Sequence, residues 1–68
     1  MSHWFGARPT KCDLCRNPIV HMFVDGKTNH GPWAIMCPAC QVERGVGLGT
    51  GRGQMYRRDG ETFKKVEG

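Results

Sequence analysis

Apolar and β-branched residues alternate with polar ones in the middle of the chain and predict a central β-hairpin. The first strand covers residues 19–25 (IVHMFVD), a turn covers 26–32, and the second strand covers 33–37 (WAIMC). In the second strand Trp33 shares a face with Cys37, because side chains two or four positions apart point to the same side. We expect this face to be the buried one.

A second hairpin is predicted at the C-terminal end. The segments QMYRR and ETFKKV flank Asp59-Gly60, a two-residue turn typical of type I′ geometry. Counting outward from this turn pairs Arg58 with Glu61 and Tyr56 with Phe63, so that opposite charges and aromatic rings meet across the strands. An isolated hairpin is marginal in water, so we expect its aromatic face to pack on the central hairpin or to extend its sheet.

The remaining segments are short. The aromatic residues Trp4 and Phe5 belong to an N-terminal arm, and we expect them to dock on the domain rather than to contact a partner. Residues 41–44 are expected to form one helical turn that Gly45 ends. The pattern thus divides a single domain into an N-terminal arm (1–10), a core with the central hairpin (11–44), a glycine-rich loop (45–53) and a C-terminal hairpin (54–68).

Glycine occupies every second position from Gly45 to Gly53. Such a loop can adopt positive φ angles and allow close approach of backbones. One interpretation is an anion-binding nest of backbone N–H groups beside Arg44 and Arg52. The other, which we favour, is a loop that threads past the cysteine turns. The loop is neither a Walker motif nor a dinucleotide fingerprint, because no G-K-[ST] follows it and no βαβ unit surrounds it.

The chain has 68 residues, 38% of them hydrophobic and ten of them glycine. A core of this size rarely contributes more than about 3–5 kcal/mol, so a disulfide or a metal ion is expected as reinforcement. No apolar stretch has the length of a signal-peptide core or of a membrane span. We therefore expect a cytoplasmic protein, in a compartment where thiols stay reduced.

Four cysteines offer that reinforcement. Cys12 and Cys15 form one C-x2-C pair, and Cys37 and Cys40 form a second after a spacer of 21 residues. Zn²⁺ binds thiolates tetrahedrally, and each pair can supply two of the four ligands. Two disulfides or a thioredoxin-like pair are the alternatives; a reducing compartment and the lack of a βαβ pattern disfavour them. The sequence predicts a small, metal-stabilised, mainly β fold: a four-cysteine zinc ribbon with a central and a C-terminal β-hairpin.

Basic residues exceed acidic ones and give a formal net charge of +4, which becomes +2 when four thiolates bind one Zn²⁺. Cations interleaved with aromatic rings can follow a phosphate backbone and stack on bases. The alternative is a solvated hairpin face whose charges are half neutralised by neighbouring acids. The candidate residues for binding a nucleic acid or another partner are Arg52, Tyr56, Arg57, Arg58, Phe63, Lys64 and Lys65.

Three segments resemble small zinc-ribbon proteins of unknown function found among phage and prophage reading frames. They are Asp25-Gly26-Lys27-Thr28, the run GPWAIMC at 31–37, and the loop at 45–54. The resemblance extends over residues 11–68 and implies the zinc-ribbon fold with the same four cysteine ligands. It implies no activity, but a small viral protein often acts by binding a host macromolecule in the host cytoplasm.

Catalysis is not expected, since the sequence shows no paired Cys/His or Ser/His arrangement and its carboxylates are scattered. Four thiolates leave zinc no open position for water, so the metal is expected to be structural. We expect a non-catalytic binding module or an inhibitor of a host protein. The alternative is a zinc ribbon that binds DNA or RNA through its C-terminal hairpin. Neither a membrane nor a small-molecule substrate is expected as a partner.

Overall fold

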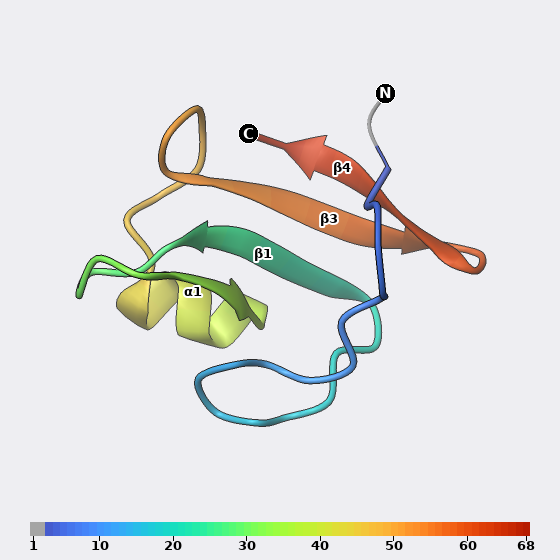
Figure 1. Ribbon diagram of the computed structural model, residues 1–68, viewed down its shortest axis with the longest axis horizontal. Helices are drawn as coiled ribbons and strands as arrows, with labels where there is room; N and C mark the ends of the chain where they lie inside the picture. Colours follow the sequence, from blue (N-terminus) through green and yellow to red (C-terminus); the bar gives the residue numbers. More distant parts are fainter. Residues whose placement is uncertain (1–2) are drawn as a thin grey trace.

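The computed structural model describes residues 3–68, which form one four-stranded antiparallel sheet and one short helix (Figure 1). The order of the strands in the sheet is β2-β1-β3-β4. The predicted mainly β fold with a central and a C-terminal hairpin is therefore confirmed. The elements are β1 (Met22–Lys27), β2 (Trp33–Met36), α1 (Pro38–Arg44), β3 (Gly53–Asp59) and β4 (Thr62–Glu67).

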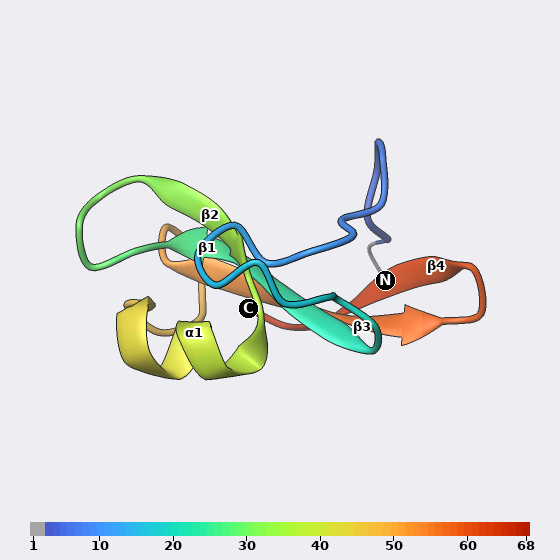
Figure 2. The ribbon, with the colours of Figure 1, turned by 90° about the horizontal axis from the view of Figure 1, so that it is seen from below.

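Strand β1 lies inside the sheet, and both of its faces are covered. Helix α1 lies on one side of the sheet and the N-terminal arm on the other (Figure 2). The adjacent residues Phe23 and Val24 point to opposite faces, and both are fully buried. The strand begins three residues later than expected, and Val20 is left outside it, 47% exposed.

The prediction that the Trp33 face of β2 is the buried one was wrong. Trp33 is 49% exposed, whereas Met36 is fully buried. Met36 lies opposite Val24 in the register, and cross-strand partners share a face. Because α1 contacts β1 and β2, the core on this side is built from Met36 and Val24, and Trp33 falls on the other face.

The register of the C-terminal hairpin also differs from the prediction. Asp59 pairs with Thr62 and Arg58 with Phe63, so the turn residues are Gly60 and Glu61. Gly60 has φ +64°, and Glu61 is not among the residues with positive φ. Glycine at the first of two turn positions with positive φ there alone is the pattern of a type II′ turn rather than type I′. Neither predicted cross-strand pair is formed.

The N-terminal arm docks on the sheet through Trp4, as expected. The Trp4 N–H donates to Phe63 O at 2.8 Å, and its ring meets those of Phe23 and Tyr56 edge-on with centroids 5.2 and 5.4 Å apart. Phe23 in turn stacks on Tyr56 and meets Phe63 edge-on, with centroids 5.1 and 4.9 Å apart. The side chain of Phe5, by contrast, is 87% exposed.

The glycine-rich loop closes on itself. Gly49 N–H donates to Gly53 O at 2.8 Å, and the N–H groups of Arg52 and Gly53 both donate to Gly49 O at 3.0 Å. Gly47 and Gly49 have φ +101° and +125°, a region that other residues rarely adopt. Because three of the loop's N–H groups bind its own carbonyls, the structure favours a folded loop over an anion-binding nest.

Helix α1 has seven residues, and none of them is buried. Pro38 occupies its first turn, where the missing N–H costs no hydrogen bond. No helix within residues 3–68 has the length and apolar character needed to cross a membrane.

Candidate metal centre

The first cysteine turn, residues 12–17, is a tight loop closed by its own backbone. Cys12 N–H donates to Asn17 O at 2.9 Å, and Arg16 N–H donates to Cys12 O at 3.0 Å. The chain reverses at Arg16, which has φ +67° and is the one non-glycine residue with positive φ among those described. This reversal lets the turn present Cys12 and Cys15 from the same loop.

Asp13 attaches this turn to the outer edge of β2. Its N–H donates to Ile35 O at 2.8 Å, and Ile35 N–H donates to Asp13 Oδ2 at 2.9 Å. One backbone and one side-chain hydrogen bond thus hold the first cysteine turn beside the end of β2. This role of Asp13 was not predicted from the sequence, where a carboxylate inside a C-x2-C pair is the one feature that could have suggested it.

The second cysteine pair is positioned by the junction of β2 and α1. Cys37 is the N-cap of α1, with an extended backbone, and Gln41 N–H donates to its carbonyl at 3.0 Å. Cys40 lies in the first turn of the helix. The strand thus delivers one sulfur and the helix the other, and Pro38 fixes the change of direction between them.

The four cysteines meet at one point, with all of their Sγ atoms within 4.8 Å of one another. Cys15 Sγ lies 3.6 Å from Cys37 Sγ. A tetrahedron with Zn–S bonds of about 2.3 Å has S–S edges of about 3.8 Å, so the cluster has the size that zinc requires. Cys12 is fully buried, Cys37 and Cys40 are partly buried, and Cys15 is exposed.

Hydrogen bonds favour a thiolate at Cys12. Burial, the largest influence, raises the pKa of this thiol, but backbone N–H groups and the Cys15 thiol outweigh it and lower the pKa from 9.0 to about 6. One of these bonds runs from Leu14 N–H to Cys12 Sγ at 3.4 Å. Burial, contacts with the other thiols and the charge of Cys12 raise the pKa of Cys40.

This donor set fits a closed metal site. Four thiolates are soft ligands that select Zn²⁺ or an iron–sulfur centre over Mg²⁺ or Ca²⁺, and a tetrahedral arrangement from two C-x2-C turns is typical of structural zinc. A metal here would tie the first cysteine turn to β2 and to α1, a helix in which no residue is buried. The cluster supports metal binding, with zinc as the ion that suits it.

The predicted partner-binding residues do not form one patch. Phe63 is 4% exposed and Tyr56 partly buried, and both rings belong to the aromatic cluster around Phe23. Their position is structural and leaves little surface for stacking on a base. Arg52 lies at the other end of β3, within the glycine-rich loop.

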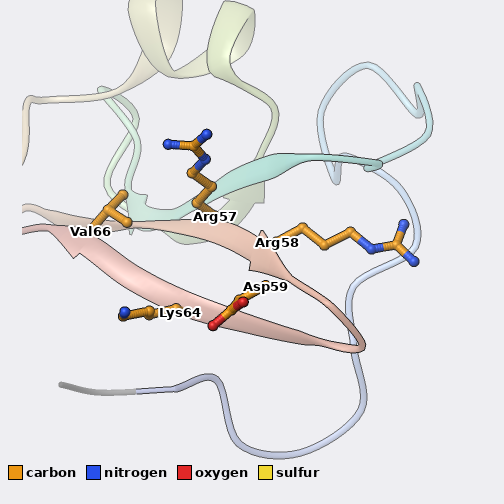
Figure 3. A pocket seen from close by; sticks show the side chains of 5 residues that line it. All are labelled: Arg57, Arg58, Asp59, Lys64 and Val66. Carbon is orange, nitrogen blue, oxygen red and sulfur yellow. The ribbon is translucent and has the colours of Figure 1, made fainter.

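The cations of the C-terminal hairpin are divided between the two faces of the sheet. Arg57 pairs with Lys64 on one face, whereas Arg58 pairs with Phe63 and Lys65 with Tyr56 on the other. A shallow groove of about 360 Å³ runs along β3 and β4, and in Figure 3 Arg57 and Arg58 point away from each other at its border. Its lining residues are Arg57, Arg58, Asp59, Lys64 and Val66.

No family model matches the chain, and no curated protein or solved structure matches it. The resemblance to phage zinc-ribbon proteins therefore stays a prediction. The functional assignment rests on the geometry of the four cysteines and on the surfaces around them.

Proposed function

We propose that the protein is a small, non-catalytic zinc-binding domain whose folded surface binds another macromolecule. The convergence of the four cysteine Sγ atoms to within 4.8 Å of one another is the observation that carries this proposal. Two turns 21 residues apart in the sequence supply them, so a bound ion would fasten distant segments of a chain with a small core.

The donor set also supports a structural rather than a catalytic metal. Zinc with four thiolate ligands has no position left for water or a substrate, and it therefore lacks the open site of zinc hydrolases. The role of such an ion is to stiffen the surfaces around it, which lowers the entropy lost when a partner binds.

A host protein is the partner expected from the phage resemblance, and exposed apolar side chains near the metal centre would suit it. Val42 on α1 is 81% exposed, and Leu14 in the first cysteine turn is 36% exposed. Leu14 borders a surface depression together with Cys15 and Cys40. A nucleic acid is the second candidate, and the half-exposed Trp33, which lies opposite Lys27 in the β1–β2 register, favours it.

Elemental analysis of the purified, untreated protein tests the metal assignment. We expect one zinc per chain by inductively coupled plasma mass spectrometry. An ordered circular dichroism spectrum from material with well below one metal ion per chain would overturn the proposal.

Affinity capture after nuclease treatment, followed by mass spectrometry, tests the partner class. Enrichment of one host protein that survives the nuclease would support a protein partner. Loss of all captured material after nuclease would instead indicate binding through nucleic acid.

A further inference from the structure

We propose that the sheet surface next to the β1–β2 turn binds single-stranded nucleic acid. A base stacks on Trp33, and Lys27 and Arg52 hold the adjoining phosphates. This site deepens the proposed function, on which it rests, and of the candidate residues suggested by the sequence it includes only Arg52.

The three residues occupy adjacent backbone positions in one row across the sheet and its glycine-rich loop. Lys27 lies directly opposite Trp33 in the β1–β2 register. On its other side Gly26 lies opposite Gly53, and Lys27 N–H donates to Arg52 O at 2.8 Å, which places Arg52 beside Lys27. Since neighbouring strands are about 4.8 Å apart, the row spans about 10 Å with Lys27 at its centre.

The aromatic member of the row is open to solvent. Trp33 is 49% exposed and Lys27 and Arg52 are exposed, whereas the other tryptophan, Trp4, is packed against the aromatic cluster. The core on this half of the sheet is built from Val24 and Met36, which lie on the opposite face. The indole of Trp33 is therefore not needed for the core.

The row lies at the end of the molecule where three segments of the chain meet. Figures 1 and 2 both place the β1–β2 turn, the glycine-rich loop and the C-terminal end of α1 together. Asn29 N–H donates to Arg44 O at 2.7 Å, and Thr28 forms a bridge with Gly45, so the Arg44 backbone is tied to the turn. The row itself contains no acid, and the nearest one on its face, Asp25, is half-buried one row away.

The backbone around the row is fixed before any ligand arrives. In the turn between Lys27 and Trp33, the N–H and hydroxyl of Thr28 both donate to Pro32 O, at 2.9 and 2.8 Å. The Arg52 guanidinium lies over the glycine-rich loop: a Cβ added to Gly49 would meet its Nη2 at 3.0 Å.

This combination fits a single strand better than a duplex or an acidic peptide. Every unpaired base offers a planar face for stacking on an indole, and stacking contributes about 1–3 kcal/mol per base whatever the sequence. A duplex hides those faces within its own stack. An acidic peptide offers carboxylates to the two cations but no planar ring for Trp33.

Fluorescence anisotropy with a labelled 15-nucleotide dT strand, titrated with the zinc-loaded full chain at about 50 mM salt, tests the proposal. We expect saturable binding, with a log–log salt slope of about −1.4 for two phosphate contacts at about −0.7 each. Trp33→Ala should weaken binding roughly 5- to 140-fold, the equivalent of the stacking contribution. Trp33→Phe, which keeps an aromatic face, should lose much less.

Charge-matched variants separate the site from general attraction to a basic protein. Lys27→Gln and Arg52→Gln should each weaken binding and make the salt slope about 0.7 shallower. Arg57→Gln removes the same charge from the C-terminal hairpin, on the face of the sheet opposite to Trp33. This variant should bind the dT strand with an affinity within about twofold of the parent protein. Equal losses from Arg57→Gln and Lys27→Gln would overturn the assigned location.

Two further outcomes would overturn the proposal. One is the absence of binding to dT or U strands at about 50 mM salt by a chain that carries one zinc and an ordered fold. The other is an oligo-glutamate peptide that binds as tightly as the dT strand and depends equally on Trp33. Neither result would contradict the proposal that the domain binds zinc. Metal content and circular dichroism test that proposal separately, on the same sample.

Discussion

Cys12 and Cys37 reach the metal centre from different kinds of backbone, a loop for one and the end of a strand for the other. Each supplies a sulfur that the remaining ligands cannot replace, because a tetrahedral site built from four thiolates has no spare donor. The exposed histidines of the chain lie outside the cluster of four Sγ atoms. Individual cysteines should therefore determine whether the domain folds.

We predict that Cys37→Ser abolishes stoichiometric zinc binding and leaves an unfolded or molten chain. A serine hydroxyl stays protonated at neutral pH and is a poor zinc ligand. Structural zinc contributes about 10–16 kcal/mol of apparent binding free energy in small peptides, more than the roughly 3–5 kcal/mol that such a core supplies. Metal analysis and circular dichroism measure the effect, with His30→Ala as the control that should keep both signals. A near-native spectrum of metal-free Cys37→Ser would contradict the prediction.

Arg16 occupies a left-handed backbone conformation, with φ +67°, in the first cysteine turn. A side chain with a Cβ costs about 1–2 kcal/mol there, and glycine does not pay that steric cost. We predict that Arg16→Gly raises the free energy of unfolding of the zinc-loaded protein by up to about 1 kcal/mol, once the larger backbone entropy of glycine is included. Lys11→Gly, at a position without positive φ, should lower it. Denaturant titration at fixed zinc concentration distinguishes the two, and a loss of stability in Arg16→Gly would refute the strain argument.

At the scale of the elements, the C-terminal hairpin shows how a turn sets the register of two strands. Gly60 is the one turn residue with positive φ, and the shift by two residues places Phe63 opposite Arg58. That position lets the Phe63 ring meet Phe23 and keeps it buried. The register that this turn sets is therefore the one in which the Phe63 ring is buried against β1.

Gly60→Ala should destabilise the hairpin by about 1 kcal/mol, because alanine is strained at φ +64° while no atom lies within 4 Å of the added Cβ. Gly60→Asn should cost clearly less, since asparagine tolerates the left-handed region. Thermal unfolding of the two variants against the parent protein measures the difference. Equal melting temperatures for Gly60→Ala and the parent would show that the turn does not hold this register.

Alternation of side chains was enough to locate both hairpins, but not their faces or their pairing. The apolar pattern around residues 19–25 identified β1, yet it could not reveal that both Phe23 and Val24 are buried, because that depends on what the arm and α1 cover. The exposure of Trp33 likewise depends on which parts of the sheet the arm and α1 cover. The Asp59-Gly60 pair located the turn to within one residue but gave the wrong turn residues and register. The β-bulge between Met55 and Tyr56 and the aromatic cluster are tertiary features that no local pattern contains.

At the scale of the whole molecule, the clustering of the four cysteines could be predicted from their spacing alone, because two C-x2-C turns separated by a hairpin can bring four thiols to one point. The surface could not be predicted in the same way. Phe63 is buried and Tyr56 partly buried, which agrees with the expected packing of this aromatic face but not with the predicted role of both rings in binding a partner, whereas Trp33 was expected to be buried and is 49% exposed. Surfaces depend on the packing of segments far apart in the chain.

The fold should depend on pH through the metal centre. The pKa of Cys12 in the folded chain, about 6, lies below its ordinary value of 9.0. The thiolate therefore stabilises the folded state fully above pH 9.0, and this contribution is lost as the pH falls through about 6. We predict that zinc release and unfolding occur together below about pH 6, because protons compete with the metal for the sulfurs.

A chromogenic zinc indicator and circular dichroism, followed over the same series of buffers from pH 8 to pH 4, measure this dependence. Half-release of zinc already at pH 7.5, or an ordered fold at pH 4 without zinc, would contradict it. The His30→Ala variant should follow the same profile, since its imidazole is not a ligand.

The two outer strands of the sheet are each bonded to another segment of the same chain. Asp13 pairs with Ile35 along β2, and the arm pairs with β4 through the His3–Lys64 bridge and the Trp4–Phe63 bond. An unpaired outer strand is a template on which identical molecules can stack into fibrils. A second copy of the chain would first have to displace these bonds. The segments that position the cysteines and Trp4 therefore also oppose polymerisation.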